Sequence, residues 1–232
     1  MRKAFIAFVA LALVAGAALL AWGPGSAGAQ GGGTIEASVT YAGAAVIEKL
    51  KINKDTEKCG TEAVIEKVVV GANKGLANAV VSVPGATGAK AVKAAIDQKG
   101  CKFVPHVVVM APGELEIKNS DDILHNVHTY STANASINKA QPKFKKVLTE
   151  KFDKPEVVKV QCDVHNWMQA WIVVGEHAAY SVSDDSGAFK LDNVPPGKHK
   201  VEVWHETLGK VSQEVEVKAG APTKVTFEMS KK

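Results

Sequence analysis

The segment "EVVKVQCDVHNWMQAWIVV", residues 156–174, places two apolar stretches on either side of a short polar loop. The stretches "VVKV" and "AWIVV" are rich in β-branched residues, and this composition is typical of β-strands. The loop between them carries Cys162, His165 and Met168, each three residues from the next. A thiolate, an imidazole and a thioether are ligands that copper accepts. The segment therefore predicts two strands joined by a loop that is equipped to bind a metal.

Strand-like patterns recur along most of the chain after residue 33. Further examples are "TIEASVTY", "AVVSV", "HVVVM", "ELEIKN", "HKVEVW" and "KVTFEM". Sequences rich in Gly, Pro, Asn and Asp separate them, as expected of short strands joined by tight turns. Residues 91–100, "AVKAAIDQKG", are interpreted as another strand, whereas in the polar connection 131–152 we expect a helical turn or two. The predicted fold class is therefore all-β, of the sandwich type.

Size and composition are those of an ordinary folded protein. The chain has 232 residues, of which 46% are apolar and 22% charged. This is enough for one large or two small domains with apolar cores. The net charge of +4 is mild and no dense basic arm is present, so a nucleic-acid partner is not expected.

The first 29 residues have the features of a secretion signal. Arg2 and Lys3 precede an apolar core, and the stretch ends in the small-residue sequence "AGA", which predicts cleavage after Ala29. Cleavage would lower the net charge to +2 and leave a periplasmic or secreted protein without a stable membrane span. The alternative is an uncleaved anchor, because residues 4–22 are just long enough to cross a bilayer.

Three cysteines cannot all pair within one exported chain, so one should remain free. Cys59 and Cys101 both lie beside a glycine in turn-like, lysine-bearing stretches, whereas Cys162 has metal-binding neighbours. We therefore predict a Cys59–Cys101 disulfide and expect Cys162 to be a thiolate ligand.

A second imidazole for the predicted site comes from "KNSDDILHNVHTY", residues 118–130, in which His125 begins a strand. Together with Cys162 and His165 it gives two imidazoles and one thiolate, with Met168 as a weak axial ligand. This ligand set is typical of mononuclear blue copper sites, which transfer electrons.

The other histidines are weaker candidates. His128 is three residues from His125, and on a regular strand these two side chains point to opposite faces. We expect His128 to be packed or exposed, and His106 is the more plausible substitute ligand. The remaining three are interpreted as structural or surface residues: His177, His199 and His205.

Several motifs stand in the order found in cupredoxins, the blue copper proteins of the amicyanin and plastocyanin type. They are F-x-P at 103–105, PGE at 112–114, HNVH at 125–128 and C-x2-H-x2-M at 162–168. The segment 91–176 therefore resembles a cupredoxin domain with a Greek-key sandwich. The resemblance implies one type 1 copper ion bound by His125, Cys162, His165 and Met168.

The resemblance also implies a role for Asn126, which is placed like the family residue that ties the ligand loop to the neighbouring strand. Two features depart from the family pattern. Asn166 follows His165 where amicyanin has a proline, and the connection 131–150 is long and rich in lysine.

A second resemblance is carried by "SVSDDSGAFKLDNVPPGKHKVEV" near the C-terminus. With "GTIEASVTYAG" at 33–43 and "GLANAVVSVPG" at 75–85, it is similar to the carboxypeptidase regulatory-like, transthyretin-like β-sandwich family. About 90 residues separate the parts, so we predict one sandwich split into 31–90 and 177–232, with the domain 91–176 inserted. The alternative is two domains in series after an unrelated N-terminal segment.

The resemblance to cupredoxins implies an electron carrier in which His165 is the exposed edge where electrons enter and leave. Trp167 and Trp171 are candidates for an apolar docking rim, although Trp171 equally suits core packing. A basic cluster in the connection could steer an acidic redox partner such as a cytochrome or a dehydrogenase: Lys139, Lys143, Lys145 and Lys146.

Two other classes of function compete with electron transfer. One is copper storage, delivery or a structural role without electron transfer, which a transthyretin-like domain would also suit. The other is a copper enzyme, but the chain has no His-x-His pair for a trinuclear centre. A mononuclear catalytic copper needs an open position, which Met168 would close, so we expect no enzyme.

Overall fold

The computed structural model describes residues 32–86, 94–176 and 179–231, and it contains four larger sheets and one hairpin. The predicted signal, its cleavage site and the predicted domain boundaries near residues 90 and 177 lie outside the described residues. The prediction of an all-β fold is confirmed for the described part, in which α1 (Thr56–Cys59) and η1 (Ala72–Lys74) are single turns. None of the described helices is long and apolar enough to cross a membrane.

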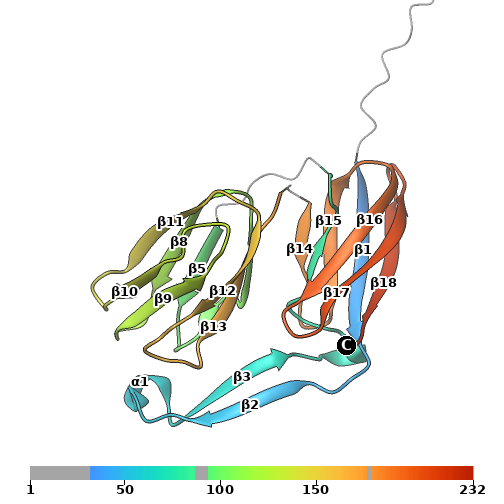
Figure 1. Ribbon diagram of the computed structural model, residues 1–232. Helices are drawn as coiled ribbons and strands as arrows, with labels where there is room; N and C mark the ends of the chain where they lie inside the picture. The colour runs from blue at the N-terminus through green and yellow to red at the C-terminus, as the bar shows by residue number, and fades with distance from the viewer. Residues whose placement is uncertain (1–31, 87–93, 177–178, 232) are drawn as a thin grey trace, which may run out of the picture. The chain divides into compact units, whose positions relative to one another are not determined.

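One pair of sheets is built from both ends of the described chain (Figure 1). The first has the order β15 (Ala188–Val194), β1 (Gly33–Tyr41), β18 (Pro222–Met229). The second has the order β14 (Tyr180–Val182), β4 (Val80–Ser82), β16 (Gly197–His205), β17 (Gly209–Val217). The apolar alternation of β1 buries Ile35, Val39 and Tyr41, because successive side chains of a strand point to opposite faces. They join one apolar core with residues of the C-terminal strands.

The turn "DDSG" packs against β1 and requires its glycine. Gly187 has φ +79°, and a Cβ there would lie 2.2 Å from the Val39 carbonyl oxygen. The Val39 N–H donates to the Gly187 carbonyl at 2.8 Å, and Asp184 closes the turn by accepting from the N–H of Ser186 and Ala188. Only glycine combines this conformation with so close an approach.

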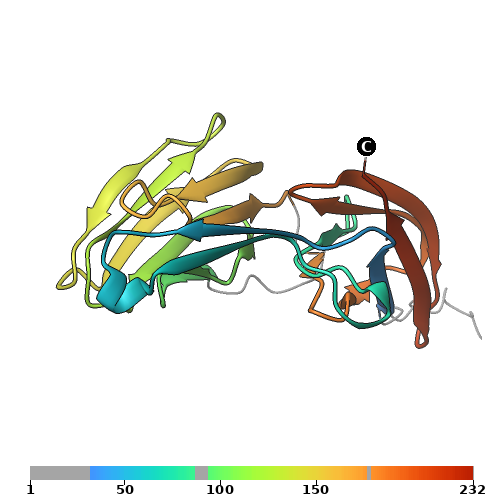
Figure 2. The same cartoon turned by 90° about the horizontal axis from the view of Figure 1, so that it is seen from below.

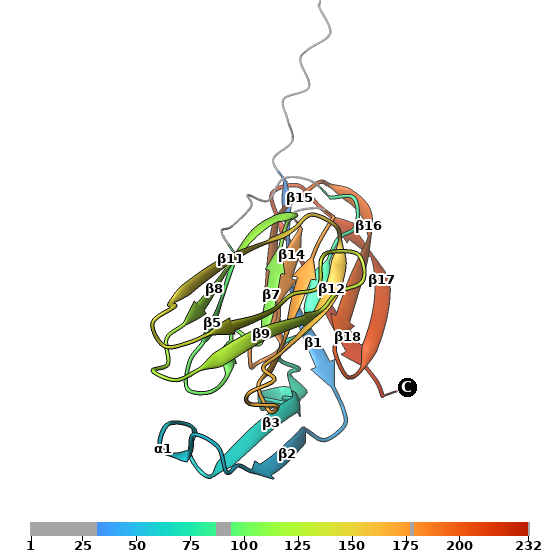
Figure 3. The same ribbon diagram turned by 60° about the vertical axis from the view of Figure 1, so that its left-hand side comes forward.

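The second pair of sheets is built from residues 94–174 (Figure 3). One sheet has the order β11 (Val147–Phe152), β8 (Gly113–Asn119), β5 (Ala94–Gln98), β6 (Phe103–Val104). The other has the order β10 (Asn138–Gln141), β9 (His125–Tyr130), β12 (Glu156–Gln161), β13 (Gln169–Val174), β7 (Val107–Met110). Ile117 of the first sheet and Val127 and Val160 of the second belong to one buried core. The same core contains Cys162 and Met168 of the predicted ligand loop.

The expectation of a helical turn in the connection 131–152 is wrong. The structure has β10 and β11 there, with Leu148 and Phe152 of β11 buried. Residues 138–141 and 147–152 instead pair with β9 and β8 as edge strands. The Glu156 carboxylate accepts the N–H groups of 132–134 before β10. The strand interpretation of 91–100 is confirmed over Ala94–Gln98.

A separate hairpin was not predicted. It consists of β2 (Val46–Lys51), α1 and β3 (Glu62–Val68), and β2 pairs with β3 alone (Figures 1 and 2). We call residues 46–68 the arm. Several apolar side chains of the arm are substantially exposed, including Ile47, Leu50 and Val64. The exposure explains why no clear apolar alternation marked these strands.

His205 in β16 should make the metal-free protein less stable in acid. It is buried, its Nδ1 accepts from the Thr207 N–H at 3.2 Å, and burial lowers its pKa to about 4. His205 takes up a proton near pH 6.5 in the unfolded chain but only near pH 4 in the folded protein. The free energy of unfolding is therefore unaffected by His205 above pH 6.5 and falls by up to about 3 kcal/mol as the pH drops from 6.5 toward 4.

The measurement is the free energy of unfolding between pH 7 and pH 4 for the wild type and His205→Asn. Asparagine keeps an acceptor for Thr207 but does not titrate, so the variant should lose less stability in acid. Equal pH dependence of the two proteins would contradict the prediction.

Candidate metal centre

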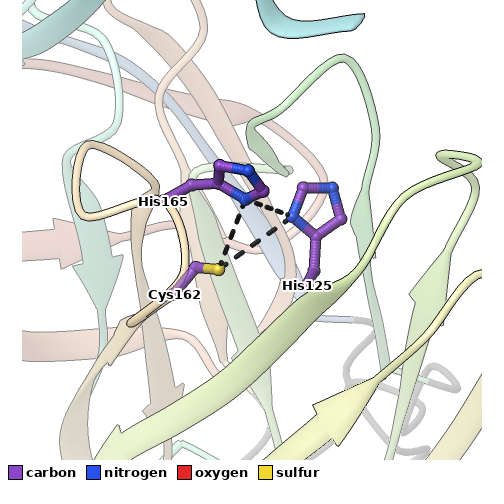
Figure 4. A group of neighbouring side chains, drawn as sticks. All are labelled: His125, Cys162 and His165. Carbon is purple, nitrogen blue, oxygen red and sulfur yellow. Dashed lines mark hydrogen bonds between the residues drawn. The ribbon is translucent and has the colours of Figure 1, made fainter. Parts of the chain in front are cut away.

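Three potential ligand atoms converge where the β12–β13 loop meets the start of β9 (Figure 4). The Nδ1 atoms of His125 and His165 are 2.9 Å apart, and the Cys162 Sγ lies 4.0 Å and 3.8 Å from them. All three residues are 0% exposed. Two imidazoles and one thiol thus face a single point inside the protein, as the sequence predicts for three of its four ligands.

The outward nitrogen of each imidazole faces a carboxylate. His125 Nε2 lies 2.9 Å from Asp121 Oδ2, and His165 Nε2 lies 2.9 Å from Asp55 Oδ2. A carboxylate accepts, so each Nε2 carries the hydrogen and each Nδ1 of a neutral ring presents a lone pair to the centre. Two lone pairs this close repel each other unless a proton or a cation lies between them. An imidazole that donates one ring N–H to a carboxylate and offers its other nitrogen to a metal is typical of carboxylate–histidine–metal sites.

Burial sets the protonation of the groups around the centre. It raises the pKa of the Cys162 thiol and lowers the pKa of His125. Burial also tends to raise the pKa of Asp121, but the N–H of Cys101, the His125 ring and the N–H of Gly100 together hold it below its usual value. An ionised Asp121 therefore stands beside neutral His125, and a bound cation would favour the Cys162 thiolate.

The ligand loop is closed by its own backbone. The Met168 N–H donates to the His165 carbonyl at 2.9 Å, and the Cys162 N–H donates to the Met168 carbonyl at 3.2 Å. This places Met168 at the end of the loop with its side chain 1% exposed, in the same apolar core as Cys162. The predicted axial ligand is thus buried on the loop that carries Cys162 and His165.

Asn126 connects the loop to β9. Its Oδ1 accepts from the Asp163 N–H at 2.6 Å and from the Val164 N–H at 3.3 Å. Its own N–H points at the Cys162 Sγ at 3.5 Å. One side chain therefore fixes the loop beside the strand that carries His125.

The alternative ligands lie away from the three-residue cluster. His128 Nδ1 lies 3.1 Å from the Asp163 carboxylate and its ring stacks on Tyr130. His106 pairs through Nε2 with Glu206. Among the described residues, neither His106 nor His128 contributes an atom to a cluster of potential metal ligands. The alternation of side chains along β9 explains why His128 turns outward while His125 is buried.

The predicted exposed edge at His165 is wrong for this structure. The ring is fully buried, and its Nε2 lies 2.9 Å from the Asp55 carboxylate of the arm. Trp167 is half-buried, its ring centroid is 5.0 Å from that of His165, and its Nε1 donates to the Cys101 carbonyl at 3.3 Å. Trp171 is also half-buried and packs edge-on against Trp204.

The predicted disulfide is confirmed. Cys59 in α1 is bonded to Cys101, and Cys162 is the free, buried cysteine. The sequence missed both carboxylates. Asp121 has a visible signal, since it lies four residues before His125 in "KNSDD". Asp55 has a weaker one: it lies four residues before Cys59, and its relevance depends on knowing the disulfide.

The lysines of the connection differ in their partners. Lys139 pairs with Glu150 at 2.6 Å and Lys146 with Asp122 at 3.4 Å. Lys143 and Lys145 are exposed on either side of Phe144, which is 82% exposed.

No family model matches the chain, and no curated protein matches it. Some solved structures are similar to part of it. A purple cupredoxin from Nitrosopumilus maritimus is 18% identical over 36% of this chain and 100% of its own, with a TM-score of 0.31. An amicyanin in its Cu(I) form is 17% identical over 41% of this chain and 98% of its own, with a TM-score of 0.33.

A copper-containing nitrite reductase from Thermus scotoductus SA-01 is also similar, at 19% identity over 40% of this chain, with a TM-score of 0.34. The match spans only 24% of the reductase. These TM-scores are too low to assign the chain to a family.

Proposed function

We propose that this chain is an exported blue copper protein that carries single electrons between redox partners. One mononuclear type 1 copper would be held by His125, Cys162, His165 and Met168. The observation that carries the proposal is the convergence of two imidazole Nδ1 atoms and one thiol within 4.0 Å of one another in a fully buried position.

The donor set fits copper. Imidazole nitrogens with a soft thiolate, and a thioether nearby, are the ligands of blue copper sites. Bound copper supplies a one-electron couple, Cu(I)/Cu(II). The protein's part is to keep the ligands fixed, since His125 lies on β9, the loop is tied by Asn126, and each imidazole is held by a carboxylate. With Met168 in the fourth position, the assignment leaves no position for a substrate.

Export of the protein is part of the proposal. The N-terminal sequence has the features of a cleaved signal, and the Cys59–Cys101 disulfide suits an oxidising compartment such as the periplasm. The sheets that contain β1 and β16 would form the split transthyretin-like sandwich. Their common core draws on residues 35–86 and 179–229, which supports an inserted metal-binding domain.

The proposed partner is an acidic redox protein, a cytochrome or a dehydrogenase. Lys143, Lys145 and Lys146 would attract it, and Phe144 would supply apolar contact at the centre of the basic group. Trp167 is less suited to this role than the sequence indicates, because its ring packs beside His165.

Electron exchange with a small anionic probe should therefore depend on salt. With hexacyanoferrate, we expect the rate constant to fall on the order of tenfold as ionic strength rises from low to several hundred millimolar. Lys143→Gln/Lys145→Gln should lower the rate at low salt and flatten this dependence. Lys224→Gln/Lys231→Gln, a change of equal charge at exposed lysines elsewhere, should keep it. Equal salt dependence of the two variants would contradict steering by the connection.

Copper storage or delivery is the second candidate, and one observation favours it. The His165 edge, which an electron carrier would offer to a partner, is covered by the arm. A covered site restricts close approach by redox proteins and protects Cu(I).

The experiment uses the mature chain from Gln30, loaded with copper and studied by cyclic voltammetry and by Cu(I) competition with a chelator. An electron carrier should hold one copper per chain, cycle reversibly and keep Cu(I) through many cycles. A delivery protein should release Cu(I) readily to the chelator and give slow, irreversible waves. Failure to retain copper in either oxidation state would overturn both functions.

A further inference from the structure

The arm has few supports of its own. Its two strands pair only with each other, and β2 has no fully buried side chain. An isolated two-stranded hairpin is marginally stable in water. The position of the arm tip, residues 55–59, must therefore depend on its contacts with the rest of the protein.

Two links connect the arm tip to the metal centre. The first is the disulfide between Cys59 and Cys101, with Cα atoms 5.5 Å apart. The second is the contact of the Asp55 carboxylate with His165 Nε2 at 2.9 Å. One link is covalent and the other is a charge-assisted hydrogen bond, and both originate in one helical turn.

The local conformation of the tip turns both side chains the same way. Asp55 precedes α1 in a left-handed conformation, φ 50° and ψ 36°, which aspartate adopts more readily than most residues. Its carbonyl accepts the N–H groups of Lys58 and Cys59, while its carboxylate makes no capping bond. The carboxylate is thus left free to bind His165. Asp55 lies four residues, or one turn of helix, before Cys59, whose disulfide to Cys101 we call the tether.

The tether also reaches the second histidine. The Cys101 N–H donates to Asp121 Oδ2 at 2.9 Å, and the same oxygen lies 2.9 Å from His125 Nε2. The Cys101 carbonyl accepts from Trp167, whose ring lies beside His165. Cys101 therefore joins the arm to the supports of both imidazoles.

We propose that the arm is a disulfide-tethered cap over the centre, in which Asp55 is a positioning residue for His165. By accepting from Nε2, Asp55 fixes the ring so that Nδ1 faces Cys162 and His125, and the tip closes this ring edge to solvent. The metal-binding part of this inference rests on the proposed function. The closure of His165 does not, because it is a property of the metal-free chain.

The first readout is the exchange of the His165 ring N–H with solvent, measured by NMR on the metal-free protein. Asp55→Gly removes the carboxylate and tolerates the left-handed conformation, and it should speed this exchange at least tenfold. Asp55→Asn keeps an acceptor without the charge and should give an intermediate rate. The control is Glu57→Gln in the same turn, because Glu57 is exposed and makes no side-chain hydrogen bond or ion pair with other described residues.

The second readout is affinity for Zn(II) and Cu(II). Loss of a partner that orients a metal-bound histidine typically lowers metal affinity 10–100-fold, and we expect a loss of about this size in Asp55→Gly. Asp55→Asn should recover part of the affinity. Glu57→Gln should bind metal like the wild type. Cys59→Ser/Cys101→Ser should release the tip and expose His165 in the same way, with the backbone spectrum of β9 and β12 as the check on folding.

The outcomes separate the two proposals. Unchanged ring exchange in Asp55→Gly would overturn the cap, even if the wild type binds copper well. Fast exchange only in the tether and Asp55 variants, with no copper binding by the wild type, would overturn the proposed function and leave the cap standing. Protection retained in the double cysteine variant would show that the disulfide does not hold the tip.

Discussion

Replacing Cys162 with serine should abolish the intense visible absorption that the wild type is expected to show with Cu(II). The colour of a blue copper site arises from charge transfer between the thiolate and the metal, and Cys162 is the free cysteine of the described residues. A serine hydroxyl is a hard, weakly acidic donor that does not replace a thiolate. We expect complete loss of the band, because no second thiolate is placed to take over.

Met168→Leu is the contrasting variant. It removes a buried thioether of the same loop but keeps the thiolate and both imidazoles, so the colour should persist while the reduction potential changes. Both variants need a check that β9, β12 and β13 remain folded. A band that survives in Cys162→Ser, or a wild type that stays colourless with bound Cu(II), would contradict the assignment of Cys162 as a ligand.

Removing the Cys59–Cys101 disulfide should lower the free energy of unfolding of the metal-free protein by about 2–4 kcal/mol. The bond closes a segment with a sequence separation of 42. Cross-links of this span restrict the unfolded chain enough to contribute stability of that order. The measurement compares Cys59→Ser/Cys101→Ser with the wild type in denaturant, using hydrogen exchange of β5 and β9 as local probes, because a chain with two cores need not unfold in one step.

The Asp55→Gly variant provides the control for this comparison, since it loses the carboxylate contact but keeps the cross-link. It should lose far less stability than the double cysteine variant. A change below about 0.5 kcal/mol on removing the disulfide would mean that the arm hardly constrains the unfolded chain.

The sequence predicts the strands that bury one face and misses those that do not. In β1, Ile35 and Val39 are buried at alternate positions, and the alternation is visible in the letters. In β2, every described side chain is exposed or half-buried, so no apolar period marks the arm. In the connection 131–152, β10 and β11 lie at the edges of their sheets and bury few side chains, so these strands also leave no clear apolar period in the sequence.

In the candidate site, too, some residues can be predicted from the sequence and others cannot. Cys162, His165 and Met168 lie within seven residues, and local spacing is enough to suggest a ligand loop. His125 required the order of motifs along the chain. Asp55 lies 110 residues before His165 in the sequence. Only the folded chain brings the two residues together, so the sequence of the ligand loop does not indicate that His165 is buried. The domain boundaries near residues 90 and 177 stay a prediction.

If Cys162 binds copper as proposed, the Cys59–Cys101 disulfide would impose an order of maturation on the protein. Cys59, which anchors the arm, and Cys162, which faces the two histidines, both carry thiols that can form disulfides or bind metal. Only the pairing of Cys59 with Cys101 leaves Cys162 free. Oxidation of Cys59 with Cys101 before copper arrives would commit these two thiols and reserve Cys162 for the metal. In a reducing compartment the three thiols would compete for copper and the tip would be unanchored. We therefore expect protein made in a reducing cytoplasm to take up copper heterogeneously, and protein oxidised first to yield a single species.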